Sequence, residues 1–400
     1  MRMYDEHSLR NDPKANFGRP YQQCSVSVMD TIADPNITFD EKGICNYYYE
    51  YLKQEKANVF SGDTGDKKLK QLVEKIIESG RGEKYNCITG VSGGVDSTYL
   101  TFMAKKLGLN PLVVHFDNSW NSEMAVMNIE NIISKLGFDL FTLVVDWEEF
   151  KDLQLSYLKA SVVDIEVLTD HAIVATLFKL AAKNNIKYIL SGNNVVTEAI
   201  LPPHWIYNKT DSVNIKSIHK KFGKVKLKTY PFFGRRERKF YIEARGMEIL
   251  PLLNYLPYNK KEVKKAIARE LNWRDYGGKH YESVFTRFYQ GYILPVKFGI
   301  DKRKAHLSNL VFSGQMSKDE ALLELQKPIY DASQLESDYE FVLKKFELTD
   351  KEFKEILDTP RREHNEFEIE RNFFVSYPFL SPLKPLMPVL KKLQIRKIDN

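Results

Sequence analysis

One short run of the chain combines the residue types that bind phosphate through the backbone: Ser92, Gly93, Gly94, Val95, Asp96 and Ser97. Adjacent glycines let the main chain approach an anion and point consecutive N–H groups at it. The serine hydroxyls add hydrogen-bond donors, and Asp96 suits either a helix cap or a magnesium ion that bridges phosphate oxygens. We therefore predict that this run, the phosphate cradle (residues 92–97), holds pyrophosphate.

The sequence around the cradle predicts a strand, a turn and a helix. A short apolar stretch precedes Ser92, and an apolar-periodic helix follows, so the positive end of the helix dipole faces the anion. The lysine of the ordinary nucleotide P-loop is absent. The run instead resembles the PP-loop signature of ATP pyrophosphatases, which release pyrophosphate and leave an adenylylated substrate. A plain glycine turn is the alternative, and the complete set of serines, glycines and aspartate argues against it.

Strands alternate with helices on both sides of the cradle. The patterns predict helices over residues 66–80 and 122–136, helical structure through Leu158, and a helix entered at Thr169 and Asp170. They predict strands over residues 111–116, 139–145 and 188–191. This alternation requires parallel β-α-β units with helices on both faces. The fold class is therefore α/β with a doubly wound parallel sheet, and the PP-loop resemblance implies an adenine nucleotide alpha-hydrolase-like version of it.

Ligands of such sheets bind beyond the carboxyl ends of the strands. The residues at the ends of two predicted strands are His115, Phe116 and Asp117, and Gly192 and Asn193. Asp117 suits hydrogen bonds from ribose or the adenine amino group, and Gly192 permits close approach of a flat base. Alone, each pair is typical of a turn. With the cradle, they predict an ATP site.

The chain divides into three predicted parts. Residues 1–62 read as a small irregular module, residues 63–245 as the PP-loop domain and residues 246–400 as a helical domain. Helices are expected in the last part over residues 260–271, 281–289, 302–312 and 317–325, with capping boxes at Ser317 and Thr349. The prolines at positions 378, 382, 385 and 388 predict an extended tail.

Bulk composition predicts a soluble, cytoplasmic, globular protein without a membrane segment. Of its 400 residues, 43% are hydrophobic, and no apolar run reaches the roughly 18 residues that span a bilayer. The net charge of +6 is modest, but eleven of the basic residues lie between Lys209 and Lys239 against two acidic ones. This basic segment (residues 209–239) indicates either an acidic ligand or a solvated loop or edge strand protected by lysine.

Beyond the cradle, the chain resembles the N-acetyl sugar amidotransferases, a PP-loop family of bacterial surface-polysaccharide biosynthesis. The resemblance covers most of the chain. The matching blocks are residues 28–31, 34–40, 43, 92–97, 169–173, 191–193, 197–202, 276–283, 285–288, 297–303 and 305–308. The cradle alone indicates only a PP-loop protein, so the downstream blocks support the family assignment.

The resemblance implies that ATP, with Mg2+, activates the acetamido group of a nucleotide-linked acidic sugar. The carbonyl oxygen attacks the α-phosphate, pyrophosphate leaves, and ammonia displaces AMP from the O-adenylyl intermediate to give an acetamidino group. Positioning and charge neutralisation then fall to Asp96, Ser97, Lys302 and Arg303. Lys302 and Arg303 equally suit a helix surface. Candidate acceptors are a UDP-linked diacetamido uronic acid and a CMP-linked nonulosonic acid, and the sequence does not identify which sugar is used.

Two further residues are candidates for sugar contact or proton transfer, His171 and Glu198. A histidine on an amphipathic helix is more often structural, so both roles stay open for His171.

The family's four-cysteine zinc site is incomplete in this chain. Cys24 and Cys45 are present, but Ser27 and Tyr48 stand where the second cysteine of each pair is expected. Two thiolates do not complete the shell of structural zinc, so we expect no tightly bound zinc.

No residues for glutamine hydrolysis are found either: the chain begins Met1-Arg2, and the part before Cys87 is too short for a fused glutaminase. We expect a separate class I glutaminase subunit.

Other functions remain open. A PP-loop tRNA-thiolating enzyme would use the basic segment for phosphates, but thiolation usually needs a cysteine after the cradle, and Cys87 is the last one. GMP or NAD synthesis fits the cradle but leaves the C-terminal blocks unexplained. A non-catalytic nucleotide- or RNA-binding protein is the remaining class, and a complete cradle argues against it. Nucleic acid and membrane are therefore not expected partners.

Overall fold

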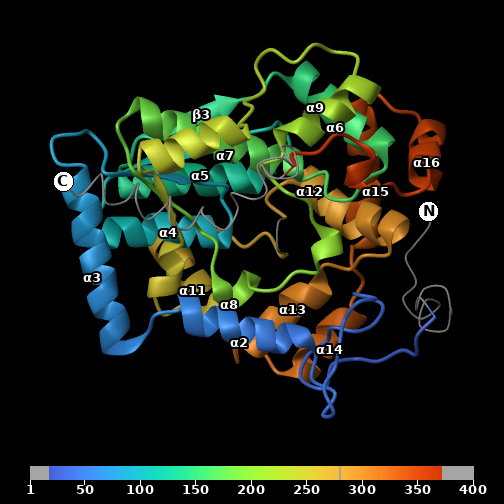
Figure 1. The fold of residues 1–400 in the computed structure, drawn as a ribbon, viewed down its shortest axis with the longest axis horizontal. Coiled ribbons are helices and arrows are strands. Elements are labelled where there is room, and N and C mark those ends of the chain that lie inside the picture. Colours follow the sequence, from blue (N-terminus) through green and yellow to red (C-terminus); the bar gives the residue numbers. More distant parts are fainter. Residues whose placement is uncertain (1–17, 279–280, 372–400) are drawn as a thin grey trace, which may run out of the picture.

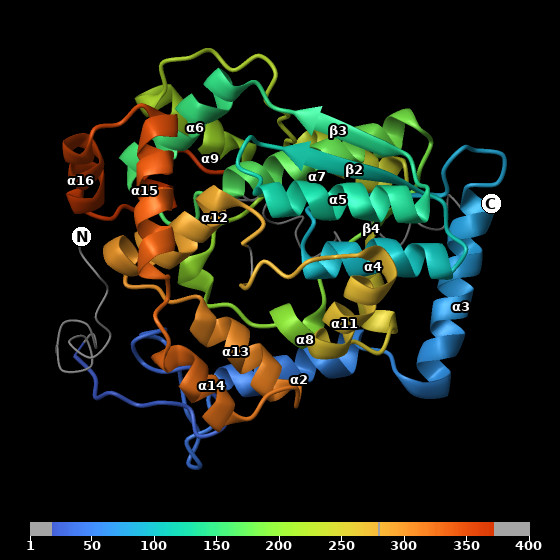
Figure 2. The ribbon, with the colours of Figure 1, turned by 180° about the vertical axis from the view of Figure 1, so that it is seen from behind.

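A five-stranded parallel sheet forms the centre of the computed structural model, which describes residues 18–278 and 281–371 (Figures 1 and 2). The strands are β1 (Cys87–Gly90), β2 (Pro111–Asp117), β3 (Leu140–Val144), β4 (Tyr188–Leu190) and β5 (Glu248–Leu250). Their order in the sheet is β3-β2-β1-β4-β5, and every neighbouring pair is parallel. The predicted doubly wound parallel sheet is confirmed.

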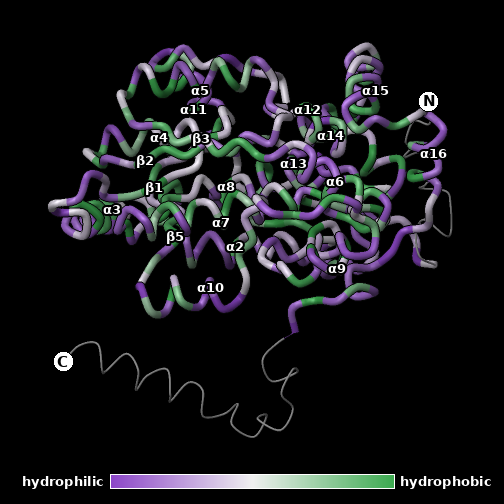
Figure 3. Tube along the Cα trace, turned by 90° about the horizontal axis from the view of Figure 1, so that it is seen from above, coloured by the Kyte–Doolittle hydropathy of each residue, from purple (hydrophilic) through white to green (hydrophobic). Residues whose placement is uncertain are grey.

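Helices cover both faces of this sheet because successive strand residues point to opposite sides. Cys87 belongs to a core shared with α4 (Val95–Lys106), α5 (Glu123–Leu136) and α11 (Lys260–Leu271). Its neighbour Ile88 belongs to a separate core shared with α7 (Val167–Lys183). The inner strands β1, β2 and β4 are buried, whereas the edge strands β3 and β5 are largely exposed. Helix α10 (Arg235–Lys239) on the outside is mainly hydrophilic (Figure 3).

Local signals place most of the predicted helices within a few residues of the observed bounds. The remaining helices are α2 (Asn46–Asn58), α3 (Gly62–Ser79), α6 (Trp147–Ala160), α8 (Val195–Glu198), α9 (Ser212–Phe222), α12 (Val284–Phe288), α13 (Arg303–Phe312), α14 (Lys318–Gln326), α15 (Ala332–Phe346) and α16 (Asp350–Asp358). Ser122 caps α5, accepting from the Ala125 N–H at 3.2 Å, and Ser317 caps α14 in the predicted capping box. The sequence did not predict α2, α9 or α15.

The boundary predicted between residues 245 and 246 is wrong. Strand β5 lies beyond it and pairs with β4, and α11 packs against α4 and α5. Three residues are too short a stretch for a clear strand pattern, and their place in the sheet comes from long-range pairing.

The helix predicted over residues 281–289 begins later than expected, because Ser283 caps α12. It also extends further than expected, as a π-helical stretch from Tyr289 to Phe298. The proline-rich tail lies outside the described residues.

The N-terminal module packs on the C-terminal helices rather than standing apart. Helix α2 lies beside α13 (Figure 2), and Val28 shares a small core with Leu307 and Ala321. Asp30 and Lys304 form an ion pair at 2.6 Å, with at most 2% of either side chain exposed. Segments far apart in the sequence therefore pack on each other here. Within the described residues, no helix is long and apolar enough to cross a membrane.

Candidate active site

The cradle lies at the point where the direction of strand addition reverses. From β1 the chain adds β2 and β3 on one side, and then crosses to add β4 and β5 on the other. The cradle follows β1, and Gly192 follows β4. A Cβ atom on Gly192 would lie 3.4 Å from the backbone nitrogen of Ser97. The structure thus brings Gly192 against the cradle, at the position where open α/β sheets bind ligands.

The cradle has the backbone shape that a phosphate needs. Gly93 has a φ of +77°, and a Cβ there would lie 2.7 Å from the carbonyl oxygen of Ala125. The Ser92 N–H donates to Ser97 Oγ at 3.2 Å, and the Gly94 N–H donates to Ser92 Oγ at 3.3 Å. Helix α4 starts at Val95, so its first amides point into the same hollow. These residues fit a pyrophosphate group.

Asp96 is oriented by two side chains that the sequence did not single out. The Tyr258 hydroxyl donates to Asp96 Oδ1, and the Asn194 amide donates to the same oxygen at 3.4 Å. Burial, and then the negative charges of Asp96 and Glu198, raise the pKa of Tyr258, which therefore stays a donor. Glu198, predicted from the sequence, thus belongs to the same charged cluster as Asp96. Asp96 is the carboxylate predicted to hold a magnesium ion against phosphate oxygens, and that role stays a prediction.

A segment between α11 and α12 crosses the N-terminal end of α4 (Figure 2). The Trp273 Nε1–H donates to the Gly93 carbonyl oxygen at 2.9 Å, and the Val95 N–H donates to the Tyr276 hydroxyl oxygen at 3.2 Å. A Cβ on Gly94 would lie 3.2 Å from Oε1 of Glu282. Sequence reasoning gave these residues no role, although Tyr276 and Glu282 lie in one of the matching blocks. Two other residues of that block, 279 and 280, lie outside the described residues.

The residues predicted at the end of β2 are held by the turn that follows it. The His115 Nδ1 pairs with the Val91 carbonyl oxygen at 3.1 Å, so it carries the proton, and Nε2 accepts from the Asn121 amide. Asp117 Oδ1 accepts from the Ser119 N–H at 2.8 Å. Phe116 is buried in the core. His115 therefore connects β2 to Val91, the residue before the cradle. Asp117 lies at the carboxyl end of β2 and also stabilises the turn that follows this strand.

A comparison with known protein families finds a match for the C-terminal part of the chain. Residues 282–381 match the family model of the LPS biosynthesis protein WbpG-like, C-terminal domain. The C-terminal part of the chain is therefore similar to the WbpG-like C-terminal domain, and that similarity is the sense in which it is called the WbpG-like domain below. This match bears out the predicted link to LPS biosynthesis, and the cradle at the switch point of a parallel sheet is the arrangement that the PP-loop resemblance predicts. No curated protein matches the sequence.

Several solved structures are similar over parts of the chain. NMN synthetase from Francisella tularensis is 16% identical with a TM-score of 0.37, covering 72% of this chain and 98% of its own. NAD+ synthetase from Burkholderia pseudomallei is 14% identical with a TM-score of 0.34, covering 75% and 98%. NH3-dependent NAD synthetase from Campylobacter jejuni is 13% identical with a TM-score of 0.27, covering 39% and 72%. The architecture described above rests on the observed sheet and not on these similarities.

Two predicted catalytic residues of the WbpG-like domain are engaged in ion pairs. Lys302 Nζ lies 2.8 Å from a carboxylate oxygen of Glu166, with 11% of its side chain exposed. Arg303 pairs with Asp301 at 2.8 Å and donates to the Lys327 carbonyl oxygen. Within the described residues these contacts join the domain to the start of α7 and stabilise its own first turn. Both cations have structural partners in the described part of the chain, and their catalytic role stays a prediction.

His171 also differs from its predicted catalytic role. Its Nδ1 pairs with the Lys209 carbonyl oxygen and its Nε2 accepts from the Phe233 N–H, both at 2.9 Å, and only 1% of the residue is exposed. Burial lowers the pKa of His171 to about 4. A neutral ring with both nitrogens bonded to backbone groups positions the chain and leaves no site for proton transfer.

The basic segment contains helix α9, so the loop or edge strand predicted there is wrong for residues 212–222. Its backbone amides bind carboxylates of α6: the Thr229 N–H donates to Glu149 at 2.9 Å and the Lys224 N–H to Asp152 at 2.8 Å. Lys209 Nζ lies 2.7 Å from Asp164. Much of this segment therefore binds acidic groups of the protein itself. An acidic external ligand stays a prediction.

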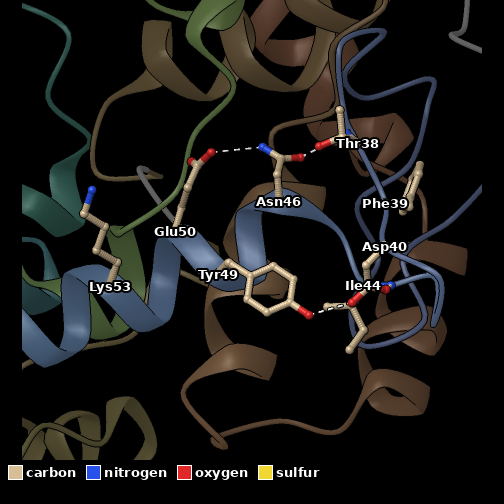
Figure 4. Close-up of a pocket in the computed structure, with 8 residues that line it drawn as sticks. All are labelled: Thr38, Phe39, Asp40, Ile44, Asn46, Tyr49, Glu50 and Lys53. Atoms are coloured by element: carbon tan, nitrogen blue, oxygen red, sulfur yellow. Dashed lines mark hydrogen bonds between the residues drawn. The ribbon is translucent and has the colours of Figure 1, made fainter.

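Two surface hollows are lined by residues outside the cradle. One, of about 410 Å3, is lined by Tyr99, Tyr258 and residues of α11, and lies directly behind the tyrosine that binds Asp96. The other, of about 500 Å3, is formed by the N-terminal module (Figure 4). Its polar groups bond to one another: Tyr49 donates to Asp40 at 2.6 Å, and Asn46 donates to Glu50 at 3.0 Å. These polar groups of the second hollow therefore already have partners within the protein.

Cys24 and Cys45 lie side by side in the N-terminal module, both fully buried. The Cys45 N–H donates to Cys24 Sγ at 3.3 Å, and the neighbouring Cys45 thiol lowers the pKa of Cys24. The part of the chain that the structure describes contains no group of three or more His, Cys, Asp or Glu side chains able to hold a metal ion. The expected lack of tightly bound zinc stays a prediction, which elemental analysis of purified protein tests.

Proposed function

We propose that the chain is an ATP-dependent amidotransferase that converts the acetamido group of an activated, acidic N-acetyl sugar into an acetamidino group. The observation that carries this proposal is the cradle at the switch point, with Asp96 oriented by Tyr258 and Asn194. The WbpG-like domain packed against the sheet supports a surface-glycan acceptor. ATP and Mg2+ are the expected co-substrate and metal.

The acceptor amide must be activated because its oxygen is a poor leaving group. In the first step the carbonyl oxygen of the acceptor bonds to the α-phosphorus of ATP, and the bond to the β-phosphate oxygen breaks. Pyrophosphate then occupies the cradle, where the Gly93 and Gly94 backbone and the start of α4 stabilise its charge. In the second step the nitrogen of ammonia bonds to the activated carbon, and the bond from that carbon to the former amide oxygen breaks, so that AMP leaves with this oxygen. The new nitrogen keeps one of its three protons and releases two to solvent, which gives the amidine.

The protein's own contribution is positioning and neutralisation. The amides of the cradle and the dipole of α4 favour the negative charge of the leaving group. A magnesium ion, when bound by Asp96 and Glu198, would supply positive charge to the same oxygens. Ammonia would come from a separate glutaminase subunit.

The test is pyrophosphate release from ATP with ammonium chloride and a panel of acetamido nucleotide sugars, with the product mass read in parallel. We expect release only with the true acceptor, and a product lighter by the difference between O and NH. Release with tRNA alone would replace this proposal with RNA modification. Asp96→Asn is the matched control, because it retains the shape of the side chain and removes its charge.

A further inference from the structure

Tyr276 occupies a position on helix α4 that a phosphate oxygen would take. The first amides of a helix have no partner within it, and an anion at a helix N-terminus binds to these groups. In this structure the Val95 N–H, the first of α4, donates to the Tyr276 hydroxyl oxygen at 3.2 Å. A Cβ atom built on Gly94 would lie 3.3 Å from the same oxygen, so the hydroxyl lies directly against the cradle backbone.

We propose that the Tyr276 hydroxyl is a built-in stand-in for phosphate, and that ATP or pyrophosphate enters the cradle by displacing it from the Val95 amide. This inference rests on the proposed function, because it names how the same site is filled. It makes the Tyr276 hydroxyl a competitor of the anion for the Val95 amide, and their exchange is part of each turnover. A neutral occupant suits this role, since it satisfies the amide without the charge that would make it hard to replace.

The segment that presents Tyr276 is fixed on both sides, so the exchange is local. On one side, the Trp273 Nε1–H donates to the Gly93 carbonyl oxygen, and Trp273 is only 4% exposed. On the other side, the Ser122 N–H donates to the Glu282 carbonyl oxygen at 2.8 Å, and the Val284 N–H donates to the Trp120 carbonyl oxygen at 2.8 Å. Gly277, directly after Tyr276, has a φ of +88°, a conformation that glycine adopts without strain.

The surrounding charges predict that this exchange needs a cation. Oε1 of Glu282 would lie 3.2 Å from a Cβ on Gly94, and burial followed by the charge of Glu282 raises the pKa of Tyr276. The hydroxyl is therefore neutral at ordinary pH. A bare pyrophosphate would meet the negative charges of Glu282 and Asp96 there, so we expect it to bind together with Mg2+.

The indole of Trp273 gives the exchange an optical signal. Its ring lies 5.6 Å from the Tyr276 ring in an edge-to-face arrangement, and its N–H is bonded to the cradle. When Tyr276 leaves the Val95 amide, the surroundings of the indole change. Magnesium pyrophosphate should therefore alter the fluorescence of the wild-type protein, and this change should be lost in Trp273→Phe.

The decisive experiment is a calorimetric titration of the full chain with magnesium pyrophosphate, comparing wild type with Tyr276→Phe. Removing the hydroxyl frees the Val95 amide, so we expect the variant to bind about threefold to tenfold more tightly, the value of one net hydrogen bond. Tyr255→Phe is the matched control, because Tyr255 packs on Phe60 away from the cradle, and it should leave the affinity unchanged.

The results distinguish a failure of the displacement proposal from a failure of the proposed ATP site. Unchanged or weaker binding by Tyr276→Phe, with the thermal unfolding of the variant like that of wild type, would overturn the displacement. So would a fluorescence change that persists in Trp273→Phe. If neither wild type nor variant binds pyrophosphate, the proposed ATP site is itself wrong and the inference falls with it.

Discussion

The phosphate cradle contains no lysine or arginine, whereas the basic segment contains eleven. Both regions bind acceptor atoms through backbone amides. In the basic segment the acceptors are the buried carboxylates of Glu149 and Asp152 on α6. In the cradle the acceptor on the Val95 amide is the neutral hydroxyl of Tyr276.

The difference lies in what each set of amides already holds. A carboxylate that accepts several amides in a buried position is costly to remove, because the amides and the charge would both lose their partners. Burial alone would raise the pKa of Glu149, yet the amides of Thr229, Lys228 and Tyr230 outweigh it and lower that pKa. A neutral hydroxyl leaves at smaller cost. The cradle can therefore exchange its occupant for an anion, while the basic segment uses its amides to hold the fold together.

The largest effect is expected from the charge at the cradle. Asp96→Asn removes the carboxylate that Tyr258 and Asn194 orient, so the pyrophosphate-releasing rate should fall by about 100-fold or more. The folded structure should persist, since Asn has the same shape. A rate assay with saturating ATP, alongside circular dichroism, checks both points. A loss of less than about threefold would show that the cradle does not depend on this charge.

The free energy of unfolding should depend on pH because His171 bonds to the backbone of Lys209 and Phe233 in the basic segment. Its pKa of about 4 in the folded protein lies below the ordinary value of 6.5, so the unfolded chain binds the proton first. The stabilising contribution is complete above pH 6.5 and is lost as the pH falls toward 4, by up to about 3 kcal/mol. Urea unfolding across this range measures it.

His171→Ala provides the control for that pH dependence. The variant should be less stable at pH 7 and should show a flatter pH dependence below 6.5. The dependence should not vanish, because burial also lowers the pKa of His364 to about 4. An identical slope in wild type and variant would contradict the structural role assigned to His171.

The backbone of the cradle can be tested with two glycines that share a conformation. Gly93 and Gly82 have φ values of +77° and +83°, but only Gly93 has a neighbouring backbone atom in the way, the Ala125 carbonyl oxygen. Gly93→Ala should lower the free energy of unfolding by about 1–3 kcal/mol and reduce the rate of pyrophosphate release about tenfold. Gly82→Ala should cost about 1 kcal/mol and keep the activity. Equal effects on activity would show that close packing at Gly93 is unimportant.

The smallest effect is expected from exposed lysines of the basic segment. Lys220 and Lys226 are exposed, so replacing both by Glu should change stability by less than about 0.5 kcal/mol. The ATP-dependent reaction should change less than about twofold. Steady-state kinetics at two salt concentrations check this. A large, salt-dependent loss would instead assign the segment to an acidic substrate or to RNA.

Local signals in the sequence determined much of the architecture. The cradle, the order of strands and helices through β4, and caps such as Ser122 and Ser317 depend on residues close together in the chain, which is why they could be predicted. Gly192 was also predictable, because parallel strands end at one edge of a sheet. The short strand β5 was missed, since its place depends on pairing with β4.

Only the tertiary structure decided which polar residues reach the site. Tyr258 and Tyr276 contact the cradle across more than 150 residues of sequence, as the separations of 162 and 181 residues in their hydrogen bonds show. Conversely, His171 and Lys302 have side chains suited to catalysis, but burial and partners from distant segments satisfy them. Residue type fixes what a side chain is able to do, and the atoms packed around it determine whether a ligand can reach it.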